Sequence, residues 1–241
     1  MESRPTTVYQ KDSLQKRRIT ALDGAFAGYY SLLVACHLAA AWQKIGWPAA
    51  VMTDSLACAY LLALLAFPGW RPLILRLLVL GLVAGICELG TDAAGERFAH
   101  SLIYPPGVPM LFASPFYMPV SWMVTLAWLG YLSLRLGSLS PSPPMWMSVV
   151  LVGLAGMITV PFYEELAGRA GWWHYAESVG SRTIGNTPLY VFVFEGAVCL
   201  LLPLIMSKLL QRSLGYAAVC GIMAGIWMPV TAFLAWISLG R

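Results

Sequence analysis

Long apolar stretches separated by short turn-forming segments dominate the pattern of the chain. Seven stretches reach the length of about 20 residues that a membrane-spanning helix requires. Glycine and proline interrupt the pattern at 46–48, 105–107 and 140–144, where they favour turns. The pattern therefore predicts an all-α, polytopic membrane protein with seven transmembrane helices, at residues 22–42, 49–67, 72–90, 112–136, 145–166, 187–209 and 214–239.

The composition narrows the class of protein further. The 241 residues are 59% hydrophobic and 11% charged, whereas about a quarter of an ordinary soluble domain is charged. So little charge excludes a soluble globular domain, a disordered chain and a nucleic-acid-binding protein. The first apolar stretch is longer than that of a cleaved signal peptide. We therefore expect a basic cytoplasmic tail at residues 1–20, followed by a single membrane domain at residues 21–241.

The positive charges predict the orientation in the membrane. With seven spans, ten of the 15 lysines and arginines fall on the side of the N-terminus. Cytoplasmic loops carry the excess of positive charge, so the N-terminus is expected in the cytoplasm. The run Lys16-Arg17-Arg18 precedes the first span and would attract anionic lipid.

The acidic residues gather on the opposite side. Eight of the 11 acids fall at that end of the predicted helices or in the adjoining loops. A carboxyl group at membrane depth costs about 2.5–3.5 kcal/mol and marks a functional site by default. Glu88 and Glu195 lie inside apolar runs, where a solvated loop does not explain them. The candidate catalytic residues are Glu88, Asp92, Glu164, Glu165 and Glu195.

The spacing of these acids affects their chemistry. Glu88 and Asp92 are four residues apart and share a helix face. Two close carboxyl groups cannot both ionise easily, so one is expected to stay protonated. Glu164 and Glu165 are adjacent and point about 100° apart. Helix packing slightly favours Glu165 as the group that faces the site, and both are retained.

The middle of the chain also predicts an internal repeat of helices 3–4 and 5–6. In each half, acids end one helix, an aromatic loop follows, and a proline and a tyrosine open the next helix. The first half carries Pro115 and Tyr117, and the second carries Pro188 and Tyr190. Proline suits the first turn of a helix, where its missing N–H costs nothing. Repeats that meet at a shared site are common in membrane proteins.

Aromatic residues are dense in the two loops beside the acids. They are typical of the interfacial belt of membrane proteins, but they can also line a pocket whose ring faces stabilise a cation. A neutral carboxylic acid could protonate an alkene there, and the rings would shelter the carbocation. The substrate would be an isoprenoid dissolved in the bilayer. The candidate substrate-binding residues are Tyr104, Tyr117, Trp122, Trp173, Tyr175, Asn186 and Tyr190.

The sequence lacks the residues that several other kinds of enzyme would need. The three histidines, His37, His100 and His174, are too few for a di-iron hydroxylase. No nucleotide-binding glycine motif and no G-x-S-x-G nucleophile motif occurs. We expect no metal and no other cofactor.

The first half of this internal repeat resembles the membrane carotenoid hydratase family. The resemblance rests on the stretch from Glu88 to Phe98, on Tyr104, on Gly107-Val108-Pro109 and on the stretch from Pro119 to Met123. More loosely, the chain is similar to membrane lycopene cyclases and terpene cyclases. The resemblance implies an enzyme that protonates an isoprenoid with a carboxylic acid and needs no cofactor. It also implies that Glu88 is a site carboxylate and that Gly90, Thr91, Gly95, Tyr104 and Trp122 shape the pocket. The pair Glu96-Arg97 and the stretch from Asn186 to Tyr190 depart from the hydratase pattern.

Two other classes of function remain open. Acids within the membrane and repeated units also suit a proton-coupled transporter of a small solute. A non-catalytic scaffold or a homo-oligomer could use G-x-x-x-G spacings, which occur at Gly81 and Gly85 and at Gly221 and Gly225. Such spacings more often serve packing inside one chain. Within the enzyme hypothesis, the sequence does not separate hydration from cyclisation.

Overall fold

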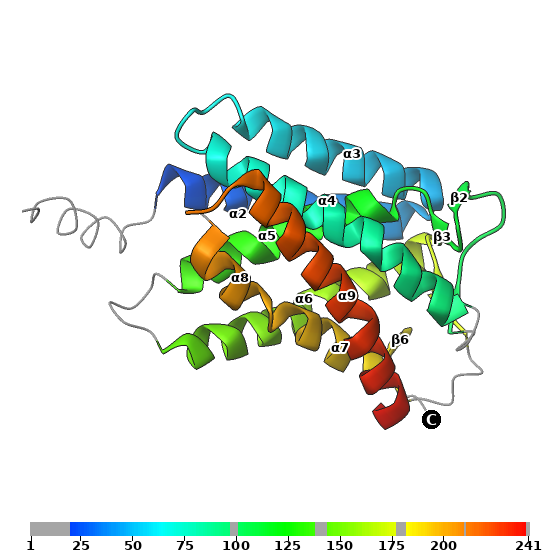
Figure 1. Cartoon of the computed structure of the whole chain (residues 1–241). Coiled ribbons are helices and arrows are strands. Elements are labelled where there is room, and N and C mark those ends of the chain that lie inside the picture. The colour runs from blue at the N-terminus through cyan, green and yellow to red at the C-terminus, as the bar shows by residue number, and fades with distance from the viewer. Residues whose placement is uncertain (1–19, 97–100, 138–143, 177–181, 210, 240–241) are drawn as a thin grey trace, which may run out of the picture.

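A computed structural model describes residues 20–96, 101–137, 144–176, 182–209 and 211–239. Nearly all of the predicted N-terminal tail, together with Arg97, His100 and Glu177, lies outside these residues. Within them the fold is a bundle of helices with very short strands in two loops (Figure 1). The helices are α2 (Ala21–Gln43), α3 (Trp47–Leu64), α4 (Arg71–Ala94), α5 (Met118–Leu136), α6 (Met145–Ala170), α7 (Leu189–Cys199), α8 (Leu202–Leu209) and α9 (Leu214–Leu239).

Six segments of the described chain are long and apolar enough to cross a membrane: α2, α3, α4, α6, α7 together with α8, and α9. The chain is therefore an all-helical protein with the features of a multi-pass membrane protein. The seventh expected span, 112–136, corresponds to α5 and is not among the six. Because α5 begins only at Met118, the expected helix loses its first turns. The count of seven spans stays a prediction.

Helix α5 lies in the interior of the bundle. It packs against α4, α6 and α8, and its buried residues include Met123, Leu126 and Leu129. A helix enclosed by protein does not need the continuous apolar surface of a lipid-exposed one. This explains why α5 can carry polar residues such as Ser121 and Ser133 along its length.

Glycines allow the central helices to approach closely. A Cβ atom on Gly85 of α4 would lie 2.5 Å from the carbonyl oxygen of Pro119 in α5. On another face of α4, a Cβ atom on Gly221 of α9 would lie 2.6 Å from the carbonyl oxygen of Leu80. The prediction that these glycine spacings serve packing within one chain is confirmed for both helices.

Two similar hairpins lie at the end of the bundle away from the start of α2 (Figure 1). In the first loop, β2 (Met110–Leu111) pairs with β3 (Ser114–Pro115), and α5 follows. In the second loop, β5 (Thr183–Ile184) pairs with β6 (Thr187–Pro188), and α7 follows. In both hairpins the first turn residue has a positive φ, 59° at Phe112 and 62° at Gly185.

A third strand pair joins the two loops. Strand β1 (Leu102–Ile103) pairs antiparallel with β4 (His174–Tyr175), with Leu102 opposite Tyr175. The backbone N–H of Ala176 also donates a hydrogen bond to the carbonyl oxygen of Ser101. These bonds bring the loop after α4 against the loop after α6, and with them the ends of both helices.

Candidate functional site

A cavity of about 280 Å³ lies at the end of the bundle where the two loops meet. Its walls come from α4, α5, α6, α7 and α9 and from the strands β1 and β4. The structure brings together eight of the twelve residues that the sequence predicted for the site. These are Glu88, Asp92, Trp122, Glu164, Trp173, Tyr175, Tyr190 and Glu195.

Asp92 is held by two hydroxyl groups from the first loop. The hydroxyl of Tyr104 donates a hydrogen bond to its Oδ2 atom at 2.6 Å, and the hydroxyl of Ser114 donates to the same oxygen. Burial, reinforced by the Asp92 carboxyl, raises the pKa of Tyr104 well above its usual value. The Tyr104 hydroxyl therefore keeps its proton and remains a donor.

Glu164 is held in the same manner by the second loop. Its Oε2 atom accepts hydrogen bonds from Trp173 Nε1 at 2.6 Å and from the Tyr175 hydroxyl at 2.9 Å. Burial, followed by the neighbouring Glu164 carboxyl, raises the pKa of Tyr175 well above its usual value. An oxygen that accepts two hydrogen bonds cannot itself present a proton to the cavity.

Glu88 and Glu195 are also buried, but their carboxyl groups have fewer hydrogen-bond partners than those of Asp92 and Glu164. Their exposed fractions are 3% and 2%, and the Oε2 atom of each has no hydrogen-bond partner in the described part of the chain. The Glu88 carboxyl also lies within hydrogen-bonding reach of Asp92 and of the Trp122 indole. An unpaired buried oxygen of this kind is rare in folded proteins and is a site to which a ligand can bind.

The four carboxyl groups form one electrostatic cluster. Glu88 interacts with Asp92 and Glu195, and Glu195 interacts in turn with Asp92 and Glu164. None of the described residues that line the cavity is a lysine, arginine or histidine. Across the same described ranges, no group of three or more histidine, cysteine, aspartate or glutamate side chains has the arrangement of a metal site. The cavity thus combines four acids with aromatic walls, and no basic residue is found among its described lining.

Glu165 lies outside the cavity, unlike its neighbour Glu164. Its Oε1 atom pairs with Arg169 Nε at 2.8 Å, and its Oε2 atom accepts the backbone N–H of Asn186 at 2.6 Å. Asn186 is likewise outside, in the turn between β5 and β6. The slight preference for Glu165 over Glu164 therefore does not agree with the structure. Glu165 and Asn186 instead connect the second hairpin to α6 through their hydrogen bonds.

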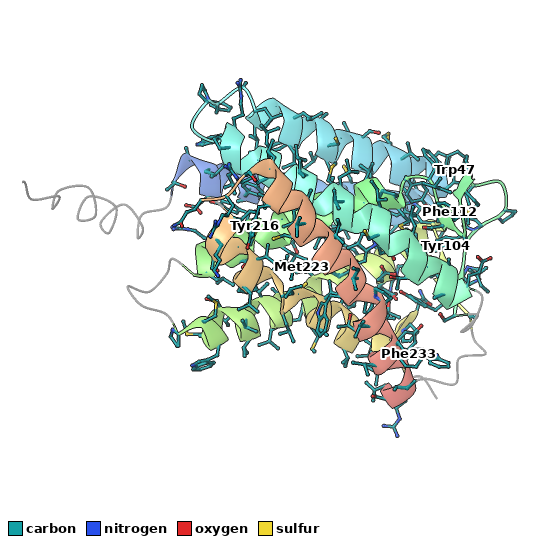
Figure 2. All side chains as sticks on the ribbon, in the orientation of Figure 1. Trp47, Tyr104, Phe112, Tyr216, Met223 and Phe233 are labelled. Atoms are coloured by element: carbon teal, nitrogen blue, oxygen red, sulfur yellow. The ribbon has the colours of Figure 1, made fainter. Side chains whose placement is uncertain are left out.

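The other two predicted residues stand behind the cavity. Tyr104 is not among the described residues that line the cavity, but it donates a hydrogen bond to Asp92, which is. Figure 2 shows Tyr104 at the end of the bundle that also carries Trp47 and Phe112. Tyr117 is 3% exposed, and its hydroxyl has no partner among the described residues.

Sequence reasoning missed two groups of residues. Ser114, which holds Asp92, stands immediately before Pro115, so the Ser-Pro pair of the hairpin was the available signal. Helix α9 supplies Pro229, Phe233 and Trp236 to the wall. Nothing in an apolar helix distinguishes residues that line a cavity from those that face lipid, so the sequence held no signal for these.

The comparisons with known proteins give a family and no named relative. Searches of curated proteins and of solved structures found no match to this chain. A family described as "Domain of unknown function (DUF6989)" matches residues 89–239. The match begins one residue after Glu88 and extends through α9, so it spans most of the cavity wall. Since it covers more than half of the chain, the protein belongs to the DUF6989 family.

Proposed function

We propose that this protein is a membrane enzyme that acts on a lipophilic isoprenoid, a carotenoid or terpenoid, by protonating an alkene with a carboxylic acid. The observation that carries the proposal is the pair of open oxygens, Glu88 Oε2 and Glu195 Oε2, in an aromatic-walled cavity that contains no basic residue among its described lining. The resemblance to the carotenoid hydratase family points to the same chemistry.

Glu88 is the preferred proton donor. A hydrogen bond between two carboxyl groups requires a proton on one of them, and Glu88 lies within reach of Asp92. Asp92 already accepts two hydrogen bonds from Tyr104 and Ser114. The proton therefore belongs on Glu88, and to reach a substrate it would have to pass from the oxygen near Asp92 to the open oxygen, Oε2. Glu195 of α7, which also lines the cavity and has an open oxygen, is the second candidate.

The reaction needs no redox change. The Glu88 proton forms a new C–H bond as the π bond breaks, which leaves a carbocation on the more substituted carbon. The faces of Trp122 and Trp173 would stabilise this cation. Water could add to the carbocation, and loss of a proton from the added water would give an alcohol. Alternatively, a second double bond of the substrate could attack the carbocation, and loss of a proton from the new cation would give a ring. In either case the released proton restores the acid.

The cavity suits the end of a long molecule. Typical small-molecule sites enclose about 300–1,000 Å³, and this cavity has about 280 Å³. A terminal isoprenoid group would fit, while the rest of a long chain would have to remain outside, among the lipids. Substrate and membrane lipid are accordingly the proposed partners, and no cofactor is proposed.

The finer topology is part of the proposal. We propose that α5 is the seventh span, because the start of α2 and the end of α9 lie at opposite ends of the bundle (Figure 1). The matching hairpins before α5 and α7, together with the Leu102–Tyr175 pair between the loops, support an internal repeat. The excess of positive charge at the α2 end supports a cytoplasmic N-terminus.

The test is product formation in a host that makes C30–C50 isoprenoids. Lipid extracts from cells with the wild type, Glu88→Gln, Glu195→Gln and the control Glu96→Gln would be compared by mass spectrometry. We expect a new product with the wild type and Glu96→Gln, and none with Glu88→Gln. Added mass of one water would indicate hydration, and an isobaric product would indicate cyclisation. No product from any precursor, or full activity in both cavity variants, would refute the proposal.

A further inference from the structure

The charge of the cavity restricts the ligands that it can hold. Four carboxyl groups line it without a basic residue among the described lining. The nearby cation Arg169 is 61% exposed at its side chain and is paired with Glu165, which faces away from the cavity. Two hydrogen-bond donors in the cavity wall, Trp173 Nε1 and the Tyr175 hydroxyl, already donate to Glu164. An anionic head group would meet repulsion and few free donors.

A cationic head group, in contrast, would meet two open acceptors. Glu88 on α4 and Glu195 on α7 both line the cavity and interact electrostatically, and each has one buried oxygen without a partner in the described chain. Leaving such oxygens unpaired is unfavourable. A single positive group between them would interact with both acids. A tertiary amine would become positive by taking the proton of one acid, whereas a quaternary ammonium, which accepts no proton, would favour loss of that proton to water.

The walls favour the same kind of head group. Trp122 of α5, Trp173 of the second loop and Tyr190 of α7 all line the cavity. Indole and phenol faces attract alkylammonium groups through their ring quadrupole, most strongly where water is excluded. Acids and ring faces together form a cage for a substituted ammonium group.

The cavity also reaches the outer face of the bundle. Phe233 of α9 lines it although 60% of this residue is exposed, and Figure 2 shows Phe233 projecting near the C-terminal end of α9. Its neighbours Val230 and Leu234 are 42% and 51% exposed. In a membrane this face of α9 meets lipid, so an apolar tail could pass from the cavity beside Phe233 into the bilayer.

From these observations we infer that the cavity binds lipophilic amines, molecules with a tertiary or quaternary ammonium head and an apolar tail. The head lies between Glu88 and Glu195 against Trp122 and Trp173, and the tail leaves beside Phe233. This ligand class concerns the same cavity as the proposed enzyme, but binding does not require turnover.

The test is equilibrium dialysis of the full chain in lipid nanodiscs with radiolabelled octyltrimethylammonium. Octanol and octanoate, which share the octyl tail but are neutral and anionic, serve as competitors, and empty nanodiscs give the background. We expect saturable binding of the ammonium at least about tenfold tighter than of octanol, and no competition by octanoate. Glu88→Gln and Glu195→Gln should each weaken ammonium binding by about tenfold or more.

Asp54→Asn is the matched control, because Asp54 is a buried acid of α3 that accepts a hydrogen bond from Ser121 and lies outside the cavity. It should bind the ammonium as the wild type does. Competition by octanoate equal to that of the ammonium, unchanged binding in both glutamine variants, or an equal loss in Asp54→Asn would overturn the inference. Ammonium binding without any isoprenoid product would reject the enzyme alone, whereas product formation without ammonium binding would reject this inference alone.

Discussion

At the residue scale, the hydroxyl of Tyr175 determines how Glu164 faces the cavity. Tyr175→Phe removes one of the two hydrogen bonds to Glu164 Oε2 but keeps the ring in the wall. We expect the Glu164 carboxyl group to stabilise the proposed carbocation, so losing a bond worth about 1–3 kcal/mol should slow the reaction roughly 5- to 150-fold. Rate at saturating isoprenoid would be measured beside Tyr216→Phe, at the far end of α9 (Figure 2). Equal rates in both variants would show that Glu164 needs no orientation by Tyr175.

The two buried tyrosines of the loops also predict how stability depends on pH. Tyr104 and Tyr175 have raised pKa values in the folded protein, so the unfolded chain loses these protons first, near pH 10. Their stabilising effect is complete below pH 10 and declines above it, by up to about 1.4 kcal/mol per pH unit for each tyrosine. Melting temperatures between pH 9 and 11 should therefore fall less steeply in Tyr104→Phe than in the wild type. Parallel curves would contradict this assignment.

At the element scale, the contact between α4 and α5 depends on particular glycines. Gly85→Ala would place a Cβ atom 2.5 Å from the Pro119 carbonyl oxygen, whereas a Cβ atom on Gly90 meets nothing within 4 Å. We expect Gly85→Ala to cost about 1–3 kcal/mol through overpacking. Gly90→Ala should be stabilising by up to about 1 kcal/mol, because alanine favours the helix. Denaturant titrations of both variants in the same lipid would check this, and an equal effect of both substitutions would contradict it.

Hydropathy predicted most of the helices, because spans of about 20 apolar residues leave little choice of structure. The start of α5 differs, because Ser114 and Pro115 form a hairpin strand instead of a first helical turn. The expected span 187–209 differs too, because it begins with strand β6 and is divided into α7 and α8. The burial cost of carboxyl groups likewise predicted Glu88 and Glu195. The choice between Glu164 and Glu165 depended on helix orientation, which contacts with Trp173 and Asn186 determine. Those contacts join residues distant in sequence, so neither periodicity nor spacing could predict them.

At the scale of the whole molecule, the proposed topology determines on which side of the membrane the cavity lies. If the N-terminus is cytoplasmic and α5 crosses the membrane, the two loops and the end of α9 lie on the opposite side. A reporter fused after Arg241 should then be inaccessible from the cytoplasm, and one inserted at Ser213, between α8 and α9, should be accessible. Alkaline phosphatase fusions, active only outside the cytoplasm, would be compared at both positions in one bacterial host.

The two fusions test whether α9 crosses the membrane and in which direction it does so. The described positive residues at the α2 end, among them Arg71, Arg76 and Arg135, favour retention of that end in the cytoplasm. With seven spans, activity is expected after Arg241 and not at Ser213. The reverse result would keep α9 as a span and contradict the proposed topology, either because the protein is inverted or because only six helices cross the membrane. Because the acids lie at the end of the bundle with few positive charges, the expected orientation places the proposed proton donors near the outer leaflet. A lipophilic substrate would then reach Glu88 and Glu195 from that leaflet, beside Phe233.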